Sequence, residues 1–203
     1  TDYYFEDINT TSSATMGKRS LTITLNDLTA EYNGTTSFAF DLPNGNIGVS
    51  ALADGDYITN NKIEIQTTSK DVGTYTIPSN DITVSISTND GINNRTNCYE
   101  KIVSGTLTVN KANLNISANN ASKHYGENNP DFTATYEGFV GNDDVNSLSG
   151  TLQFTCSANE FSTPGNYDIT PSGLTSDNYE INFIKGTLTV NKANLNISAN
   201  NAS

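Results

Sequence analysis

Four aspartates in expected loops are the side chains of this chain best placed to do chemistry. Asp54 and Asp56 form one pair, and Asp143 and Asp144 form another at the matching place further along. Carboxylate oxygens that cluster in a loop are ligands for Ca²⁺, although the spacing of an EF-hand is absent. Aspartates also cap turns by bonding to nearby backbone N–H groups. We therefore expect these four residues to shape their loops, with calcium binding as the alternative.

The chain contains few of the residues that common catalytic sites require. Paired carboxylates can hydrolyse glycosidic bonds, but a duplicated pair is more typical of a repeated turn than of an active site. Any Ser–His–Asp or Cys–His arrangement would need the one histidine, His124, which we expect to be a partly exposed residue beside a Tyr-Gly turn. A zinc site needs three or four Cys or His ligands. We predict no catalytic residue, no cofactor and no enzyme activity.

The two cysteines, Cys98 and Cys156, lie in different halves of the chain. A bridge between them is left open, because connectivity cannot be deduced from spacing. Cys156 alternates with Leu152 and Phe154. We therefore expect it on a core face, where a free cysteine behaves as a small apolar residue.

The charge of the chain argues against two classes of partner. It carries 10 Lys and Arg against 22 Asp and Glu, a formal net charge of −12, with no basic cluster. Binding to nucleic acid or to an anionic membrane surface requires a basic face. No apolar run approaches the roughly 20 residues of a transmembrane helix. We predict neither nucleic-acid binding nor membrane insertion.

An internal duplication dominates the sequence. Residues 105–122 read GTLTVNKANLNISANNAS, and residues 186–203 repeat every letter at a spacing of 81. Such a match indicates a unit repeated in tandem. Looser matches extend the unit, because a Leu, an Ile two positions later and a Tyr eleven positions after the Leu begin at Leu21 and again at Leu114.

These matches divide the chain into four segments. We predict an extension or the end of a preceding unit at 1–19, a first repeat at 20–112, a second at 113–193, and the first strand of a truncated third at 194–203. The first repeat holds about 12 extra residues between Ile77 and Tyr99, where we expect an added loop or hairpin. The short joints at 110–113 and 191–194 lack Gly and Pro, which favours a semi-rigid rod.

Alternating apolar and polar residues indicate strands in both repeats. We predict two tandem all-β modules, each a small sandwich of Ig-like character. The alternative is a β-grasp-like α+β module with a short helix near residues 144–148. The pairs Tyr75 and Tyr167, and Tyr99 and Tyr179, recur at equivalent strand positions. A core residue or a corner pinned by a hydroxyl group would recur in this way.

A series of motifs runs through the second repeat in a specific order: Tyr125-Gly126, Asn129-Pro130-Asp131-Phe132, Tyr136-Glu137-Gly138-Phe139-Val140, Pro164-Gly165-Asn166-Tyr167, Asn178-Tyr179 and Gly186-Thr187-Leu188-Thr189-Val190. Through these motifs the second repeat resembles the MBG domain of the YGX type over residues 114–193. The first repeat carries Tyr32-Asn33-Gly34-Thr35-Thr36, Asp54-Gly55-Asp56 and Val72-Gly73-Thr74-Tyr75, through which it is similar to the related YDG type. Asn33 replaces the usual Asp there, and the insertion before Tyr99 departs from the pattern.

Such domains form arrays in large secreted and surface-attached bacterial proteins. The resemblance therefore implies an extracellular, cell-surface module of an adhesin or filament and assigns no catalytic residue. We expect a structural spacer whose partners are neighbouring repeats, with self-association into a fibre left open. The alternative is a module that itself binds a glycan or a host surface protein.

Overall fold

The computed structural model describes residues 19–25, 28–41, 47–50, 56–58, 62–77, 86–88 and 99–198. The chain divides into two compact units, which are described separately. The first comprises Thr1–Asn26, Ala39–Gln66 and Thr76–Gly105, and the second comprises Asp27–Phe38, Thr67–Tyr75 and Thr106–Ser203. Within the described residues, no helix is long and apolar enough to cross a membrane.

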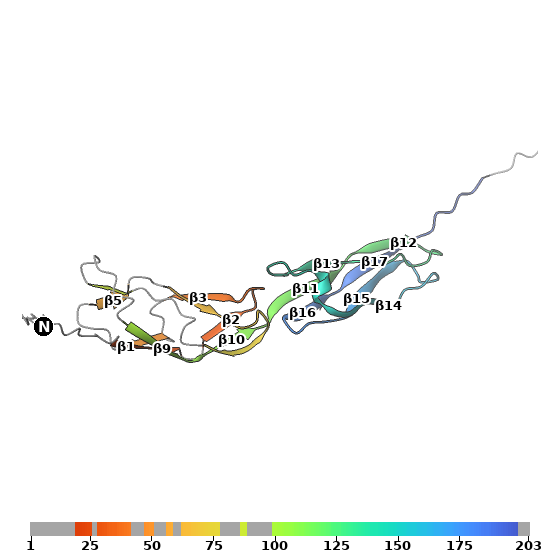
Figure 1. Cartoon of the computed structure of the whole chain (residues 1–203). Coiled ribbons are helices and arrows are strands. Elements are labelled where there is room, and N and C mark those ends of the chain that lie inside the picture. The colour runs from red at the N-terminus through yellow and green to blue at the C-terminus, as the bar shows by residue number, and fades with distance from the viewer. Residues whose placement is uncertain are drawn as a thin grey trace, which may run out of the picture. The chain divides into compact units, whose positions relative to one another are not determined.

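Most of the second unit is a sandwich of two sheets (Figure 1). The three-stranded sheet has the order β13-β11-β16, and the four-stranded sheet has the order β12-β17-β15-β14. The strands are β11 (Ala112–Ala118), β12 (Ala121–His124), β13 (Ala134–Glu137), β14 (Ser149–Cys156), β15 (Gly165–Thr175), β16 (Tyr179–Ile184) and β17 (Gly186–Asn191).

The alternation read from the sequence builds this core. In β11, Leu114 and Ile116 are fully buried, whereas Asn113, just before Leu114, is exposed. From the facing sheet, Ile169 and Leu188 are also fully buried. Each such aliphatic side chain contributes roughly 1.5–3 kcal/mol when it leaves water. The predicted all-β, Ig-like sandwich is confirmed.

The helix expected near residues 144–148 is one turn of 3-10 helix, η2 (Val145–Ser147). It buries no residue, so within residues 99–198 there is no packed helix of the kind that a β-grasp-like module requires. The sandwich interpretation therefore holds over its alternative.

A small sheet completes the second unit. Its order is β2-β10-β7, formed by β2 (Leu28–Glu31), β10 (Thr106–Asn110) and β7 (Gly73–Thr76). Leu28, Leu107 and Val109 are buried there. Because β10 leads through Lys111 into β11, this sheet is covalently continuous with the sandwich.

The described part of the first unit is also made of strands. The order β4-β1-β9 forms one sheet, while β3 pairs with β6 and β5 pairs with β8. The strands are β1 (Arg19–Leu25), β3 (Ser37–Asp41), β4 (Ile47–Ser50), β5 (Asp56–Ile58), β6 (Lys62–Gln66), β8 (Ile86–Thr88) and β9 (Tyr99–Ser104).

The sequence duplication is also a duplication of strand pairing. Strand β1 pairs parallel to β9 with Arg19 opposite Tyr99, and β11 pairs parallel to β16 with Ala112 opposite Tyr179. These are equivalent positions of the two repeats. The other parallel pairs agree in the same way, with Leu28 opposite Leu107 and Ala121 opposite Leu188. The repeated residues therefore specify one pairing pattern twice.

Of the two roles left open for the recurring Tyr75 and Tyr167, the structure shows the corner pinned by a hydroxyl group, and Cys156 packs on a core face as predicted. The hydroxyl group of Tyr167 donates to the backbone oxygen of Thr163 over 2.8 Å, and that of Tyr75 donates to Asp71 in the same way. Both tyrosines are half-buried corner residues. Cys156 is a half-buried free thiol that packs against the core, whereas Cys98 lies outside the described residues.

Candidate functional site

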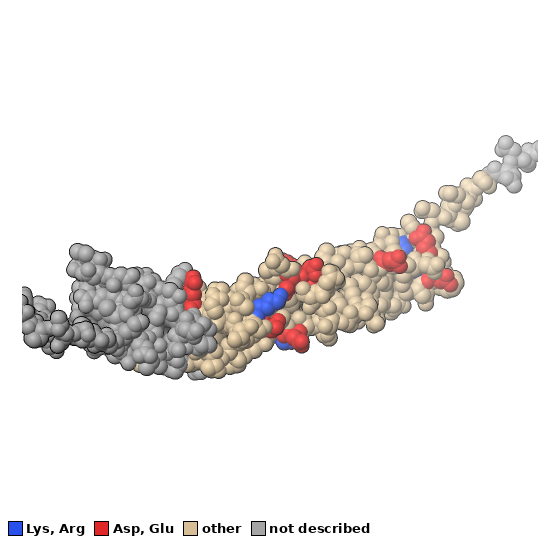
Figure 2. All heavy atoms as spheres, in the orientation of Figure 1, with Lys and Arg blue, Asp and Glu red and all other residues tan. Residues whose placement is uncertain are grey.

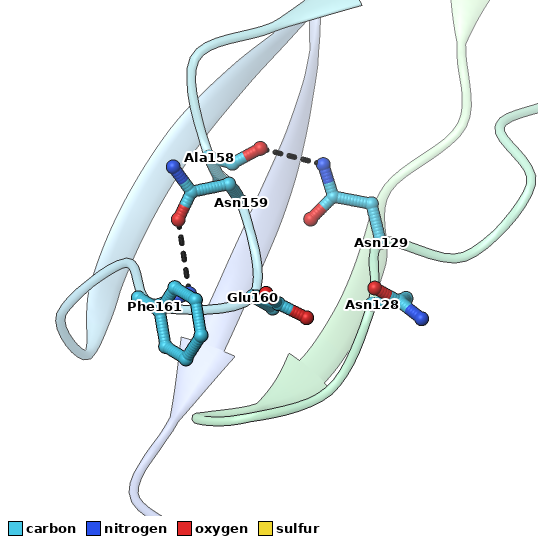
Figure 3. Close-up of a pocket in the computed structure, with 6 residues that line it drawn as sticks. All are labelled: Asn128, Asn129, Ala158, Asn159, Glu160 and Phe161. Carbon is cyan, nitrogen blue, oxygen red and sulfur yellow. Dashed lines mark hydrogen bonds between the residues drawn. The ribbon is translucent and has the colours of Figure 1, made fainter.

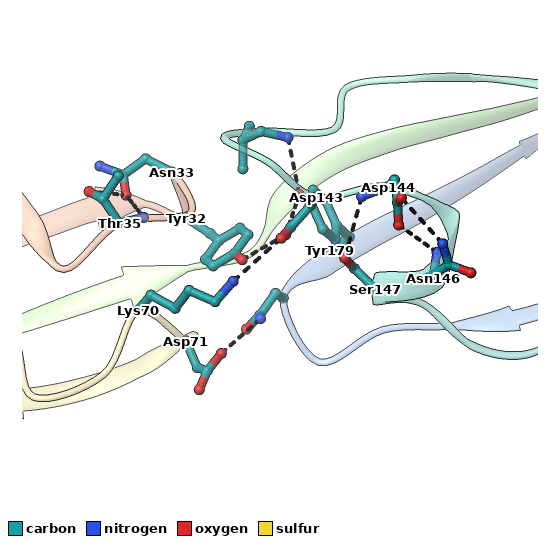
Figure 4. A network of polar contacts seen from close by, with 12 residues as sticks. Tyr32, Asn33, Thr35, Lys70, Asp71, Asp143, Asp144, Asn146, Ser147 and Tyr179 are labelled. Carbon is teal, nitrogen blue, oxygen red and sulfur yellow. Dashed lines mark hydrogen bonds and ion pairs between the residues drawn. The ribbon is translucent and has the colours of Figure 1, made fainter.

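The most organised polar group of the second unit is a set of six residues that we call the tyrosine–aspartate cluster. Its members are Tyr32, Lys70, Asp71, Asp143, Asn178 and Tyr179. Figure 4 labels all of them except Asn178.

The sequence places the cluster at the ends of strands. Tyr32 directly follows β2, and its backbone N–H donates to the carbonyl oxygen of Asn110, the last residue of β10, over 2.8 Å. Tyr179 is the first residue of β16. Asp143 lies in the turn before η2, where its N–H donates to the carbonyl oxygen of Val140 over 3.1 Å. Backbone bonds therefore fix all three side chains.

The Asp143 carboxylate is the centre of the cluster. Its Oδ2 accepts from the hydroxyl groups of Tyr32 over 2.7 Å and Tyr179 over 2.9 Å. Its Oδ1 lies 3.4 Å from the Lys70 Nζ. The side chain of Asp143 is only 9% exposed. A carboxylate this enclosed needs such donors, because burying an unpaired charge is costly.

A second set of hydrogen bonds surrounds this centre. The Asn178 side chain donates to Asp71 Oδ1 over 3.0 Å, and its oxygen accepts from the backbone N–H of Val72 over 2.9 Å. The Tyr179 hydroxyl oxygen accepts from the N–H of Val140 over 3.1 Å. Each of these bonds links segments that are far apart in sequence.

Aromatic packing holds the cluster from its apolar side. Tyr32 and Tyr179 are each 2% exposed, and their rings meet edge to face with centroids 5.4 Å apart. Phe139 meets Tyr179 edge to face at 5.6 Å. Gly138, the residue before Phe139, lies against the backbone of β11, because its φ is 116° and an added Cβ would lie 2.4 Å from the carbonyl oxygen of Asn113. The glycine of the Tyr-Glu-Gly-Phe motif therefore lets the chain pass close to β11 just before Phe139.

Burial and hydrogen bonding shift the ionisation of these groups. Burial raises the pKa of Tyr32 to about 12, and the Asp143 carboxylate adds to that rise. Burial also raises the pKa of Tyr179 to about 12. Burial alone would raise the pKa of Asp143, but the hydroxyl groups of Tyr32 and Tyr179 and the charge of Lys70 outweigh it, so the pKa of Asp143 is lowered. The stable state is a carboxylate held by two neutral phenols.

An alkaline titration should detect the two buried phenols. Because their folded pKa values lie near 12, above the ordinary 10.0, they should stabilise the fold below about pH 10 and lose this effect as the pH rises toward 12. Phenolate absorbance should show two tyrosines that ionise near pH 12. The Tyr32→Phe and Tyr179→Phe variants should each lose one of these steps, and full ionisation of the wild type near pH 10 would contradict the assignment.

The cluster is built to hold segments together. Both oxygens of Asp143 accept hydrogen bonds from protein donors. Asp144 caps η2, because its Oδ1 accepts from the N–H of Asn146 over 2.8 Å. The loop-shaping role predicted for Asp144 is therefore confirmed, while Asp143 bonds mainly to distant segments. Asp54 lies outside the described residues, and only the backbone of Asp56 is described, as the first residue of β5.

The other residues considered from the sequence lie apart from the cluster. His124 ends β12 and is exposed, with its Nδ1 3.5 Å from Glu127. Its backbone N–H donates to the Glu127 carboxylate and lowers the pKa of that group. Lys111 donates to the carbonyl oxygen of Ser176 over 2.8 Å. Within the described residues, no three His, Cys, Asp or Glu side chains lie close enough together to hold a metal ion.

A pocket lies where the loop after β12 meets the loop after β14 (Figure 3). Its volume is about 560 Å³. The Asn129 side chain donates to the carbonyl oxygen of Ala158 over 2.7 Å across it, and the Phe161 ring beside it is 69% exposed. The lining residues are Asn128, Asn129, Ala158, Asn159, Glu160 and Phe161.

The sequence patterns do not reveal the cluster as a unit. They predict Tyr179 as a core or corner residue and Asp143 as a loop residue, but they connect neither with Tyr32 or Lys70. Those two residues belong to the other sequence repeat, and spacing along the chain does not reveal contacts between repeats. The available signal was that the Tyr32 position, like the Tyr179 position, recurs in both repeats.

Comparison with known proteins gave one family and several structures. The model of the MBG domain (YGX type) matches residues 114–189. A solved structure of Clostridium thermocellum CbhA fibronectin(III)-like modules is 13% identical, with 88% of this chain and 96% of that chain covered and a TM-score of 0.26. Sidekick-1 immunoglobulin domains 1–4 are also 13% identical, with 87% and 49% covered and a TM-score of 0.26. The comparison with curated proteins gave no match.

Proposed function

We propose that this chain, in which residues 114–189 are an MBG domain of the YGX type, is a stretch of extracellular repeat modules that acts as a semi-rigid spacer in a bacterial surface adhesin or filament. Residues 20–112 are proposed as a related repeat of the YDG type, because the two repeats share strand registers. In this role the shared residues maintain the fold of each repeat.

The tyrosine–aspartate cluster is the observation that carries this proposal. Tyr32 and Lys70 come from the first sequence repeat, Asp143 and Tyr179 come from the second, and all four lie in one compact unit. The joint between the repeats, 110–113, holds no Gly or Pro. A buried carboxylate bonded from both sides resists rotation about this joint, which is the property that a spacer needs.

The surface supports the same proposal. Most of the described face in Figure 2 is uncharged, and its acidic side chains gather mainly in two groups, each beside a basic side chain. The hydrophilic character of the chain comes chiefly from Asn, Thr and Ser rather than from ion pairs, since only 16% of residues are charged. Such polar faces suit a sandwich that is exposed to water on both sides.

Small-angle scattering can test the spacer role. The whole chain should scatter as a particle without flexible joints. A variant with four glycines inserted between Asn110 and Lys111 should show a broader distribution of sizes, because the joint can then swivel. Equal flexibility in the two chains would overturn the spacer. Antibody labelling of intact cells that make the parent protein tests the extracellular location, and labelling only after permeabilisation would refute it.

A binding module is the second candidate, and the pocket of Figure 3 favours it. An exposed aromatic ring beside amide side chains is a common way to hold a sugar. A glycan array probed with the whole chain distinguishes the two functions. Binding that is lost on Phe161→Ala but kept on Tyr136→Ala would support a binding module, whereas the spacer predicts no binding.

A further inference from the structure

One tyrosine occupies the same position as Tyr32 but lacks its surroundings. Tyr125 directly follows β12, as Tyr32 directly follows β2. Its backbone N–H donates to Asn191, the last residue of β17, over 2.9 Å, as that of Tyr32 donates to Asn110 over 2.8 Å. Yet Tyr125 is 45% exposed, whereas Tyr32 is 2% exposed. Tyr125 and Tyr32 therefore have the same position relative to their strands and the same backbone hydrogen bond, and they differ in the exposure of the side chain.

The loops around Tyr125 also match those around Tyr32. The Tyr167 hydroxyl group donates to the backbone oxygen of Thr163, and the Tyr75 hydroxyl group donates in the same way to the backbone oxygen of Asp71. The neighbouring loop is tied to the tyrosine loop by a bond from the N–H of Gly126 to the carbonyl oxygen of Glu160 over 2.9 Å. We call residues 125–129 together with 158–164 the β12 end surface. It corresponds to the part of the first repeat, residues 32–36 and 66–72, that contacts Asp143 and Asn178.

The segment that follows β17 identifies the partner of this surface. Residues 193–198 repeat the letters of 112–117, which belong to the central strand β11. Leu114 and Ile116 are fully buried between the two sheets, but their copies Leu195 and Ile197 are 83% and 87% exposed. The joint sequence before each copy is identical. A strand formed by this segment would need partners equivalent to β13 and β16, and a further copy of the same module has them.

We propose that the β12 end surface is a docking site for a further MBG module in the same polypeptide, whose first strand is residues 193–198. The aspartate of that module at the position of Asp143 accepts the hydroxyl hydrogen of Tyr125, and its tyrosine at the position of Tyr179 packs against the Tyr125 ring. The proposal rests on the proposed function as an array of modules, and it specifies how one module holds the next.

The proposed second joint, at residues 191–194, differs in charge from the first joint, at residues 110–113. Lys70 and Asp71 pair with Asp143 and Asn178 at the first joint, whereas Ser162 and Thr163 occupy the matching positions on the β12 end surface. The charged contact is therefore absent from the second joint, and the neighbouring Phe161 offers apolar area instead. The second joint should consequently depend less on salt than the first.

A chain extended by one module tests the docking. Residues 113–193 are appended after Ala193, and Tyr125→Phe is made in both the extended and the original chain. In the extended chain this change should lower the equilibrium constant for folding about ten-fold, because the buried aspartate loses a donor. In the original chain it should have almost no effect, because the hydroxyl group is exposed.

A double-mutant cycle separates docking from general instability. The second change replaces the appended aspartate that corresponds to Asp143 with asparagine, and the two changes should be non-additive only in the extended chain. Hydrogen exchange at the appended copy of β11 establishes that the third module has folded. Additive effects with a folded third module would overturn the proposal, as would dimers of the unextended chain that Tyr125→Phe dissociates. Neither result would contradict the contacts at the first joint or the proposed function as a spacer.

Discussion

Replacing Tyr179 with alanine should lower the free energy of unfolding of the second unit by about 3–5 kcal/mol. The side chain is 2% exposed and makes edge-to-face contacts with both Tyr32 and Phe139. Its loss removes buried apolar area and leaves the Asp143 carboxylate with one phenol fewer. Chemical denaturation, followed by a probe in the second unit, measures the change.

The matched control for this prediction is Tyr125→Ala, the same substitution at an exposed position. It should cost no more than about 0.5 kcal/mol in the unextended chain. Tyr179→Phe should lie between the two, at about 1–3 kcal/mol, because it keeps the ring and removes only the hydroxyl group. A Tyr179→Ala variant as stable as Tyr125→Ala would show that the cluster does not stabilise the unit.

Asp143→Ala should destabilise the second unit by about 2–4 kcal/mol, because two buried phenol groups lose their acceptor and Lys70 loses its partner. The pKa of Asp143 is lowered in the folded state, so its stabilising effect is complete above its unfolded value. The effect should fade as the pH falls through the folded value. Denaturation of wild type and variant at neutral and acidic pH measures both results.

Asp144→Ala is the control for Asp143→Ala, since it removes a carboxylate from the neighbouring position. It deletes only the cap of a three-residue helix and should cost about 0.5–1 kcal/mol. A cycle between Asp143→Ala and Tyr32→Phe should give a coupling of roughly 1–2 kcal/mol. Equal losses from the two aspartates, or no coupling, would contradict the central role of Asp143.

Local patterns in the sequence were sufficient to predict strands and the all-β class. Alternation along residues 112–118 predicts which side chains of β11 are buried, and the recurrence of Tyr75 and Tyr167 predicts either a core residue or a pinned corner. These features depend on neighbours that are close in sequence or on a pairing that the duplication repeats. The all-β sandwich class could therefore be predicted from the sequence.

The cluster could not be predicted by the same means. Tyr32 and Tyr125 occupy equivalent positions, yet one is buried and the other is exposed, because burial here depends on a contact with another repeat. Lys123 is a further example, since it is 4% exposed and its Nζ donates to two backbone oxygens, of Glu127 and Asn159. Its position in an alternating strand predicts an inward side chain, but its charge argues for exposure.

The parallel pairing of β12 with β17 has a mechanical consequence. Tension on a repeat pulls on Ala112, where β11 begins, and on Asn191, where β17 ends. Because β11 with β16 and β12 with β17 are parallel pairs, this pull slides neighbouring strands past each other and strains their hydrogen bonds together. Peeling would break these bonds one at a time. The strand pairing of the module is thus oriented to withstand stretching between these two ends.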